Sequence, residues 1–337
     1  MELSVVIACK NEVATIGELL RDLADQSFPK PFEVMIADGL SDDGTREVLA
    51  RFQALDMPYD LRVVDNPSGT IPDAWNTAVA EARGKYIIPL GSHSRLPGDY
   101  LESLVNALRE PGRDVVGPTT RIIPGADTRL AREIALALNT ILGTGGTLAR
   151  GNLREPTRVD HAPWHCYSRE LWEAIGGYDE NLLTNEDFDF DYRANLQGFG
   201  VWSLPYPQVT IVARASLRRL VRQRFRYGYW KWQVVKRHPR SLRLRQLLPV
   251  FVTAGVVTST VLGFRRPKLL LLPFAYGLFL CLYSANLSMH ESSRPRWWRL
   301  AIIYATTHLA WGSGFLWGLV TQPRDISHKI EALRSSS

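Results

Sequence analysis

The sequence predicts an α/β domain built on a mostly parallel sheet, followed by a basic amphipathic helix and an apolar C-terminal region. Three observations predict this order. Short β-rich runs alternate with helical stretches from residue 1 to about 215, a basic segment with helical periodicity begins near residue 217, and long apolar runs follow it. Such alternation is typical of βαβ units on a parallel sheet.

The predicted strands are the runs LSVVIAC, FEVMIAD, LRVVD, KYIIPLG and DVVG, and the helical stretches between them include 13–25, 44–55 and 72–82. In such sheets ligands bind beyond the carboxyl ends of the strands, so the residues after each run are the first candidates for a site. We expect four regions: an α/β domain at 1–215, a basic amphipathic helix at 216–245, an apolar membrane region at 246–322 and a polar tail at 323–337.

Composition limits the class of protein. Of 337 residues, 45% are hydrophobic and 22% are charged, which is enough for a core and excludes a globally disordered chain. The net charge of +6 fits either a nucleic acid or an anionic membrane, and the basic residues concentrate beside the apolar runs, which favours the membrane over nucleic acid. The start, MELSVVIAC, lacks the features of a signal peptide, so we expect the α/β domain in the cytoplasm.

The segment LRRLVRQRFRYGYWKWQVVKRHPR predicts a helix in a membrane interface. Its apolar residues recur at helical spacing, with basic residues on other faces: Leu217, Leu220, Val221, Phe225, Tyr229, Trp232 and Val235 against Arg218, Arg219, Arg222, Arg224, Lys231 and Lys236. The alternative is a basic surface helix packed on its own domain.

Three apolar segments follow, at 247–264, 269–288 and 300–320. A membrane helix needs about 20 apolar residues, so the second and third qualify and the first is marginal. Three spans would place the basic residues at 265–268 outside, against the positive-inside rule, whereas a hairpin that re-enters from the cytoplasm would not. Both topologies stay open at this point.

Acid-rich motifs follow the first two strands. The motif ACKNE occupies 8–12, and IADGLSDDGT occupies 36–45, with Asp38 at a strand end. Taken alone, the second motif is also compatible with a turn that caps a helix beginning at Thr45. A third motif, GGYDENLLTNEDFDFDYRANLQGFGVW at 176–202, has acids at the start of a predicted helix, where we interpret Asp189 and Asp191 as partners of the helix dipole.

Together these motifs resemble those of inverting glycosyltransferases of family 2, which have the Rossmann-like GT-A fold. The family pattern is P-x-x-N-E followed by V-D-D-G-S-x-D-x-T, with Ala8 here in place of proline and Leu40 in place of serine. The chain is similar to a membrane-associated branch of succinoglycan-type exopolysaccharide glycosyltransferases. The resemblance implies that Asp38 binds the donor base, and that Glu12, Gly39 and Asp42 belong to the same nucleotide pocket.

The stretch NPSGTIPDAWNTAVAEARGKYIIPLGSHSR resembles the family segment that leads to a metal-binding D-x-D, which is D-A-H in this branch. Aligned on His93, the motif aspartate falls at Gly91 and its alanine at Ser92. The resemblance places Lys85, Ser92 and His93 at the donor. Without the aspartate, His93 and the diphosphate oxygens are left to hold a divalent cation, Mn more readily than Mg, or arginine and lysine neutralise the leaving group instead.

Two further motifs carry implied roles. The sequence NED resembles the family's E-D motif, which implies that Asp187 is the general base and that Glu186 binds the acceptor or tunes the base by like-charge repulsion. Gln223-Arg224-Phe225-Arg226-Tyr227 resembles Q-x-x-R-W, with tyrosine in place of tryptophan. That match implies that Gln223, Arg224 and Arg226 bind the donor diphosphate, since one guanidinium group can donate hydrogen bonds to two phosphate oxygens.

The stretch VDHAPWHC offers acceptor-binding residues. We expect Trp164 and His165 to line the acceptor pocket, because aromatic faces stack on sugars. His161 and His165 have i, i+4 spacing, but Pro163 between them disfavours a helical zinc pair. The glycine-rich stretch 142–156 lacks the Lys-Ser/Thr pair of a P-loop and is predicted to be a mobile flap.

The resemblance thus implies a membrane-bound inverting glycosyltransferase, multi-pass in the cell membrane with its catalytic domain in the cytoplasm. It would move a sugar from a nucleotide-sugar donor, interpreted as a UDP-sugar, to a lipid-linked or polysaccharide acceptor. Two alternatives stay open: a synthase of polyprenyl-phosphate sugars, and a catalytically degenerate membrane subunit that binds nucleotide or sugar.

Overall fold

The computed structural model describes residues 1–145 and 153–321. The chain forms two compact units: the first comprises Met1–Arg121 and Thr147–Ile211, and the second comprises Ile122–Gly146 and Val212–Ser337. The predicted tail at 323–337 and the centre of the glycine-rich stretch at 142–156 lie outside the described residues.

An eight-stranded sheet has the order β3-β2-β1-β4-β7-β5-β8-β6. Its strands are β1 Leu3–Cys9, β2 Phe32–Asp38, β3 Asp60–Asp65, β4 Tyr86–Gly91, β5 Val115–Ile123, β6 Thr157–Arg158, β7 Cys166–Ser168 and β8 Val201–Val212. The four strands β3, β2, β1 and β4 are parallel, as predicted. Beyond β4 the pairing changes, because β7 runs antiparallel to both β4 and β5 and β6 runs antiparallel to β8. The sheet is therefore mixed.

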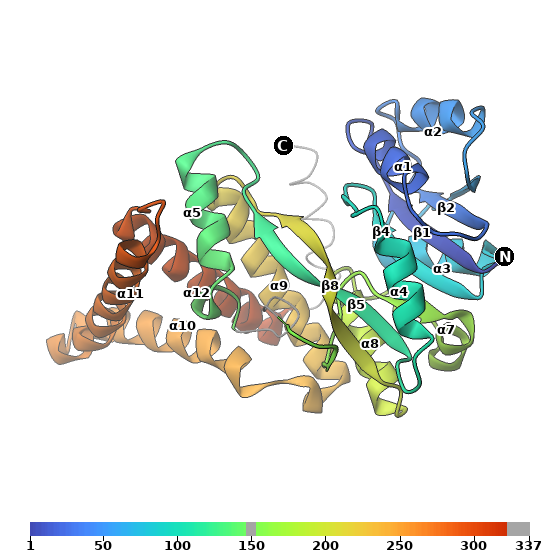
Figure 1. Cartoon of the computed structure of the whole chain (residues 1–337). Helices are drawn as coiled ribbons and strands as arrows, with labels where there is room; N and C mark the ends of the chain where they lie inside the picture. The colour runs from blue at the N-terminus through green and yellow to red at the C-terminus, as the bar shows by residue number, and fades with distance from the viewer. Residues whose placement is uncertain (146–152, 322–337) are drawn as a thin grey trace. The chain divides into compact units, whose positions relative to one another are not determined.

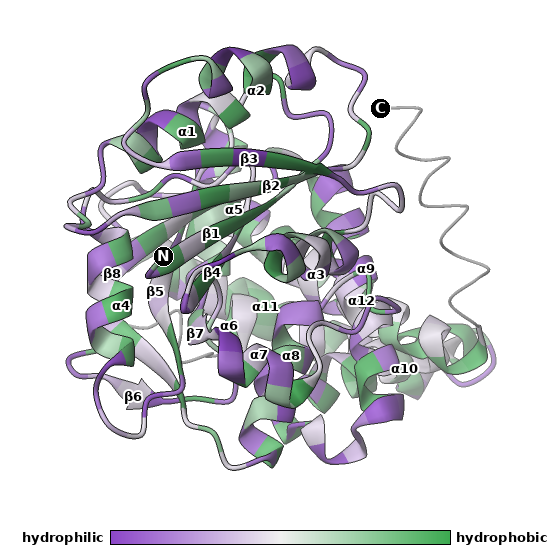
Figure 2. Ribbon diagram, turned by 90° about the vertical axis from the view of Figure 1, so that its right-hand side faces the viewer, coloured by the Kyte–Doolittle hydropathy of each residue, from purple (hydrophilic) through white to green (hydrophobic). Residues whose placement is uncertain are grey.

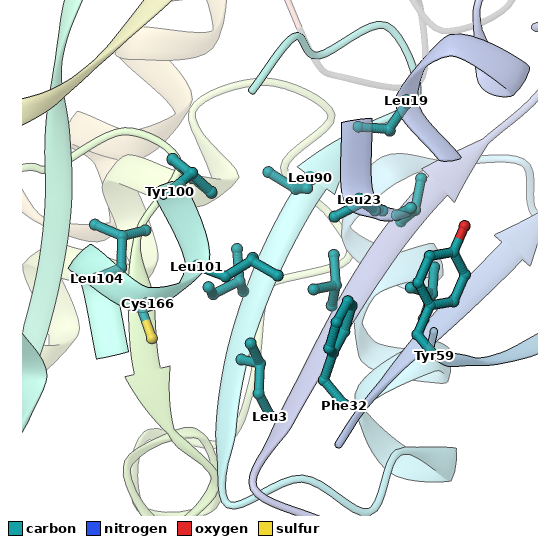
Figure 3. Packing of buried hydrophobic residues seen from close by; sticks show 14 of the residues in the cluster. Leu3, Leu19, Leu23, Phe32, Tyr59, Leu90, Tyr100, Leu101, Leu104 and Cys166 are labelled. Atoms are coloured by element: carbon teal, nitrogen blue, oxygen red, sulfur yellow. The ribbon is translucent and has the colours of Figure 1, made fainter. Parts of the chain in front are cut away.

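Helices of the first unit cover both faces of the parallel strands (Figure 1). They are α1 Ile16–Ala24, α2 Thr45–Gln53, α3 Ile71–Glu81, α4 Tyr100–Leu108, α7 Arg169–Ile175 and α8 Glu186–Leu196. Side chains from α1 and α4, such as Leu23 and Leu101, pack with Leu3 and Leu90 on one face (Figure 3). The opposite face packs Val6 and neighbours against α3, α7 and α8.

This double coverage explains the apolar strand sequences. Every residue of β2 is buried, and β1 is buried at all positions but one. A parallel strand with helices on both faces needs apolar residues at consecutive positions, and the hydrophobic colouring of β1 and β2 in Figure 2 follows this rule.

The second unit is helical. Its elements are α5 Arg129–Leu138, α6 Ile141–Thr144, α9 Leu217–Arg237, η2 Pro239–Ser241, α10 Leu244–Gly263, η3 Pro267–Leu270, α11 Leu271–His290 and α12 Trp297–Val320. Helix α12 packs along α9 at very short range. A Cβ added at Gly228 of α9 would clash with the Trp311 carbonyl oxygen, and one at Gly314 of α12 would clash with that of Phe225. Small residues at such positions let two helix backbones approach closely.

Helix α12 covers part of α9. The side chains of Leu220, Tyr229, Trp230 and Val234 are buried, and α12 lies against the helix. Val221, which the periodicity placed on the apolar face, is 43% exposed. This packing is compatible with a helix in a membrane interface and with a basic helix packed on its own unit, so the interface helix stays a prediction.

Two described segments, Leu244–Gly263 and Pro267–His290, are long and apolar enough to cross a membrane. They correspond to the predicted segments at 247–264 and 269–288, so the marginal first segment meets the criterion. The predicted span at 300–320 does not meet it among the described helices, although it forms most of α12. Large apolar side chains such as Phe251, Phe264 and Phe274 are exposed on α10, its C-cap and α11.

Candidate active site

The carboxyl ends of β1, β2, β3 and β4 lie at one edge of the sheet, because these four strands run parallel. Asp38 ends β2, Asp65 ends β3, Glu12 follows β1 and His93 follows β4. Candidate residues that follow separate strands in the sequence therefore lie at the same edge of the sheet. It is the edge where ligands bind in open parallel sheets.

Hydrogen bonds join the loop after β1 to the loop after β2. Ser41 Oγ accepts from the Asn11 amide at 2.8 Å, and Thr45 Oγ1 accepts from the Glu12 amide at 2.8 Å. Asp43 Oδ2 accepts from the Val13 amide at 3.2 Å. These contacts give the two acid-rich motifs a structural role, since they fix the position of Glu12 over the sheet edge.

Asp38 is fully buried, and its carboxylate is already bound from two sides. Ser41 Oγ donates to Oδ1 at 2.6 Å, and Arg46 Nε donates to Oδ2 at 2.6 Å. Arg46 also pairs with Asp65. Sequence analysis missed both Ser41 and Arg46, and it noted Leu40, whose side chain is exposed, only as the replacement of the family serine. The serine that serves Asp38 is one position later than we aligned it.

The side chain of Lys10 leaves little room for a side chain at Gly39. A Cβ at this position would lie 2.9 Å from Lys10 Cδ, so the lysine side chain crosses directly over the glycine. The same lysine approaches Gly69, at the end of the loop after β3, with its amine. Lys10 thus brings a positive charge to the acidic sheet edge, and sequence analysis did not select it.

Glu12 and His93 face each other across the ends of β1 and β4. Glu12 Oε1 lies 3.7 Å from His93 Nδ1, and Thr15 Oγ1 donates to Glu12 Oε2 at 2.7 Å. Burial raises the pKa of the Glu12 carboxyl, but His93 and Thr15 lower it by more, so the net shift is downward. Ser92 is buried beside the same carboxylate and contributes to this shift. Glu12 is therefore an anion at neutral pH.

These residues do not by themselves make a metal site. Within residues 1–145 and 153–321, no three His, Cys, Asp or Glu side chains are grouped so that they could hold a metal ion. Glu12 and His93 provide two donors, and a cation held there would need phosphate oxygens from the donor to complete its shell. A Cβ at Gly91 would meet only His93, at 3.6 Å, an ordinary van der Waals contact, so the backbone there accommodates a side chain.

Of two further residues expected at the donor, Lys85 lies away from this edge and Asp42 lies at it. Lys85 immediately precedes β4, at the amino end of the parallel strands, where its amine lies over the Tyr86 ring. The structure thus does not bring Lys85 to the edge that carries Glu12 and Asp38. Asp42 is at that edge with an exposed side chain, and its amide donates to Asn11 Oδ1 at 3.0 Å.

A second polar cluster surrounds α8. Asp191 Oδ2 lies 2.7 Å from His161 Nδ1 and accepts from the Ala162 amide at 2.9 Å. Asp191 Oδ1 lies 2.8 Å from His165 Nδ1, an ion-pair contact that lacks the alignment of a straight hydrogen bond. The other ring nitrogen of His161, Nε2, faces Asp187 Oδ2 at 3.6 Å. Burial raises the pKa of Asp191, but the two histidines lower it by more, and the carboxylate is ionised.

Exposure separates the four acids of α8. The Asp187 side chain is 35% exposed, whereas Glu186 is 8%, Asp189 1% and Asp191 0% exposed. The prediction that Asp189 and Asp191 lie on the helix surface is therefore wrong, although Asp189 is in the first turn, where it can interact with the helix dipole. Asp189 instead forms a buried ion pair with Arg193, at 2.8 Å. Periodicity alone could not show this, because the helix has acids on a face that other polar groups cover.

The acceptor prediction needs a similar correction. His165 is 1% exposed, and its Nε2 lies 3.0 Å from the Tyr178 hydroxyl within an aromatic cluster. It is part of the core and does not line an open pocket. Trp164 is partly buried in a left-handed conformation (φ 51°), and its carbonyl accepts from the Tyr100 hydroxyl at 2.8 Å.

The expected diphosphate residues are all on α9 of the second unit. Arg224 is buried, with its guanidinium 5.9 Å from the centre of the Tyr227 ring. Gln223 Nε2 donates to the Tyr227 hydroxyl at 3.4 Å, and Arg226 is partly buried. The tyrosine that replaces the family tryptophan therefore contacts both Gln223 and Arg224.

Comparison with known proteins agrees with this architecture. A family model described as glycosyl transferase family 2 matches residues 4–176. The chain is 34% identical over 316 residues to the succinoglycan biosynthesis protein ExoA of Rhizobium meliloti (strain 1021), with 92% of this chain and 93% of ExoA covered. It is 22% identical over 307 residues to a dolichyl N-acetyl-alpha-D-glucosaminyl phosphate 3-beta-D-2,3-diacetamido-2,3-dideoxy-beta-D-glucuronosyltransferase of Methanococcus voltae, with 84% and 94% covered.

Among solved structures, the mannosyltransferase PcManGT from Pyrobaculum calidifontis, in complex with GDP-Man and Mn2+, is similar with a TM-score of 0.62 and 18% identity. The match covers 94% of this chain and 87% of PcManGT, and it supports the fold. The matched family model and the identity to ExoA along nearly the whole chain show that this protein is a glycosyltransferase of family 2 with a GT-A-like α/β domain.

Proposed function

We propose that this glycosyltransferase takes a sugar from a UDP-sugar and, with inversion, attaches it to a lipid-linked or polysaccharide acceptor at the cytoplasmic face of the cell membrane. ExoA is named for succinoglycan biosynthesis, and the Methanococcus voltae relative is named for transfer to a dolichyl-phosphate-linked sugar. Both names support an exopolysaccharide or lipid-linked acceptor.

One observation carries the proposal: Asp187 is the accessible acid of α8, while its acidic neighbours on that helix are buried. Inverting transfer needs a base that takes the proton of the acceptor hydroxyl as its oxygen attacks the anomeric carbon. The bond from that carbon to the diphosphate oxygen breaks, the nucleoside diphosphate leaves with the electron pair, and the proton stays on Asp187. Buried Glu186 then has a supporting position beside the base.

The donor nucleotide is proposed to bind at the sheet edge. Asp38, fixed by Ser41 and Arg46, offers directional hydrogen-bond acceptors to the base, and Gly39 and Asp42 follow it in the same loop. Ser92, Glu12 and His93 are proposed to lie toward the diphosphate. A divalent cation bound there through Glu12, His93 and phosphate oxygens would stabilise the charge of the leaving group.

Gln223, Arg224 and Arg226 are proposed to contribute positive charge to the diphosphate, on the strength of their sequence pattern. Guanidinium groups suit this task because they stay protonated and present a fork of donors that matches phosphate oxygens. Family members with an aspartate at the position of Gly91 use it to hold a metal ion that neutralises the diphosphate. In this chain the two arginines would supply part of that neutralisation.

Membrane attachment is proposed through α10 and α11. These helices meet the length and composition of membrane spans, and large apolar side chains are exposed along both. Contiguous apolar surface of this kind is rare on soluble monomers and marks a membrane or protein interface. An enzyme held in this way meets amphiphilic acceptors at the membrane surface.

The test is donor-dependent labelling of a membrane lipid extract by the full-length protein. Radiolabelled UDP-glucose, UDP-galactose, UDP-N-acetylglucosamine and GDP-mannose are supplied separately, with the parent protein and with Asp187→Asn. Glu47→Gln, an exposed acid on α2, is the matched control. We expect label from a UDP-sugar with the parent and the control, and a labelling rate lower by about 10²- to 10⁴-fold with Asp187→Asn. Unchanged labelling by Asp187→Asn would instead indicate a phosphate nucleophile, which needs no base.

A further inference from the structure

We propose that His161 is a positioning residue for the base: anchored by buried Asp191, it turns its Nε2 toward Asp187 and takes over the proton that Asp187 removes from the acceptor. The inference rests on the proposed function of Asp187 and adds a residue and a proton path to it. All the residues involved belong to the first unit.

The first step is the state of Asp191. Its side chain is fully buried, yet it has the Ala162 amide at 2.9 Å and two imidazole Nδ1 atoms at 2.7 and 2.8 Å. An isolated charge would not be stable at such a site, and these partners compensate its burial. A carboxylate without a proton only accepts hydrogen bonds, so the 2.7 Å contact requires His161 to carry a proton on Nδ1.

The second step is the direction of His161. When the ring is neutral, with Nδ1 protonated and turned to Asp191, the lone pair of Nε2 lies on its other side. That side faces Asp187, with Nε2 at 3.6 Å from Oδ2. The distance is longer than a hydrogen bond, as is common for catalytic contacts before substrates bind. The ring edge also lies against Phe188, with centroids 5.8 Å apart, which limits its rotation.

The third step is the proton balance. When the acceptor oxygen bonds to the anomeric carbon, its proton passes to Asp187. Transfer of that proton to Nε2 returns Asp187 to its anionic form and makes His161 an imidazolium between two carboxylates. The His161 side chain is 26% exposed, so water can then take the proton. The path of the proton from the acceptor to Asp187, His161 and water changes only O–H and N–H bonds and needs no further reactant.

His165 provides a matched comparison on the same carboxylate. Its Nδ1 also contacts Asp191, but its Nε2 lies 3.0 Å from the Tyr178 hydroxyl and the side chain is 1% exposed. Both histidines therefore support Asp191, whereas the geometry lets His161, and not His165, reach Asp187. An effect of His161 that is merely structural should be shared by His165.

The experiment uses the full-length protein and whichever of the four radiolabelled donors labels the lipid extract with the parent. For His161→Ala we expect a loss of kcat of about 10- to 100-fold with the donor KM unchanged. This loss is smaller than the rate enhancement of about 10²- to 10⁴-fold that a general base supplies. Added imidazole should restore at least several-fold of that rate through the partly exposed site. His161→Asn keeps an amide donor toward Asp191 and should fold like the parent, yet lose the same kcat.

Two controls make the result decisive. His165→Asn should show no response to imidazole, because its ring is enclosed. The double variant Asp187→Asn, His161→Ala should be no slower than Asp187→Asn, since both residues act in one step. The inference is overturned, and the proposed function stands, if Asp187→Asn shows the expected loss while both His161 variants match the parent. The same conclusion follows if added imidazole raises the rate of the His161 variants by no more than it raises the rate of His165→Asn. If Asp187→Asn itself matches the parent, the proposed function fails.

Discussion

His161 Nδ1 lies 2.7 Å from Asp191 Oδ2, and this contact joins a loop residue to the buried face of a helix that begins 25 residues later with Glu186. The contact helps to stabilise the buried negative charge of Asp191 inside the first unit. Asp191 is the common partner of two histidines, and its neighbour Asp187 is left accessible. The arrangement separates a structural acid from a reactive one on the same helix.

Replacement of Asp191 by asparagine should destabilise the first unit. The change removes the charge that two imidazoles face, and loss of one partner of a buried ion pair costs about 3–5 kcal/mol. We expect a clear fall in the thermal midpoint of the detergent-purified protein, measured by intrinsic fluorescence. Glu47→Gln, an exposed acid, should leave the midpoint unchanged. A midpoint equal to the parent for Asp191→Asn would contradict the assigned role.

The same residue predicts a pH dependence. Because the folded-state pKa of Asp191 is lowered, its stabilising contribution is complete above the unfolded value of about 3.9 and is lost as pH falls through the folded value. The difference in midpoint between the parent and Asp191→Asn should therefore be constant near neutral pH and shrink below pH 3.9. A difference that grows toward acid pH would show the opposite linkage.

Gly91→Asp should strengthen metal binding. The backbone there is ordinary and a Cβ has room beside His93, so the variant should fold. A carboxylate adds the oxygen donor that Mn²⁺ and Mg²⁺ favour. In the presence of UDP, we expect the Kd for Mn²⁺, measured by titration calorimetry, to fall at least about tenfold. Gly91→Asn has the same size without the charge, and equal affinity for the two variants would exclude the carboxylate effect.

Arg46→Gln should weaken nucleotide binding. Arg46 donates to Asp38 at 2.6 Å and also pairs with Asp65, so its loss leaves the fully buried carboxylate with the hydroxyl and amide of Ser41. A buried carboxylate that loses its charged partner either moves toward solvent or favours its protonated form. We expect the UDP Kd to rise about tenfold, or roughly 1.4 kcal/mol. Arg51→Gln, on the same helix, is the control.

The contact of α9 with α12 gives a prediction for the second unit. Gly228→Ala places a methyl group against the Trp311 carbonyl, and overpacking of this kind costs about 1–3 kcal/mol. Gly277→Ala, in α11, meets no atom within 4 Å and should be neutral or slightly stabilising. Lower thermal midpoints for Gly228→Ala alone would confirm the close packing. Equal midpoints would contradict it.

Much of the parallel half of the sheet could be predicted from sequence, because runs such as LSVVIAC and FEVMIAD are apolar at consecutive positions and end in polar motifs. They became β1 and β2 within a residue of expectation. The antiparallel strands β7 and β8 were not predicted. β7 has three residues, too few for a periodic signal, and β8 is interrupted by Pro205 and Pro207.

The site could be predicted in part. Motif residues Glu12, Asp38 and His93 were placed at one edge, since strand ends set their positions. His161 and Asp191 were misjudged because their roles depend on a contact between residues 30 positions apart. His165 looked suitable for sugar stacking, but tertiary packing buried it against Tyr178. Local patterns identify the kind of side chain and leave its partners undefined.

The central claim is that Asp187 is the base for transfer. Its most direct test compares kcat and UDP binding for the parent and Asp187→Asn, with the radiolabelled UDP-sugar that labels the lipid extract. The account predicts a kcat lower by about 10²- to 10⁴-fold with the UDP Kd unchanged. An Asp187→Asn variant that transfers sugar at the parental rate would contradict it.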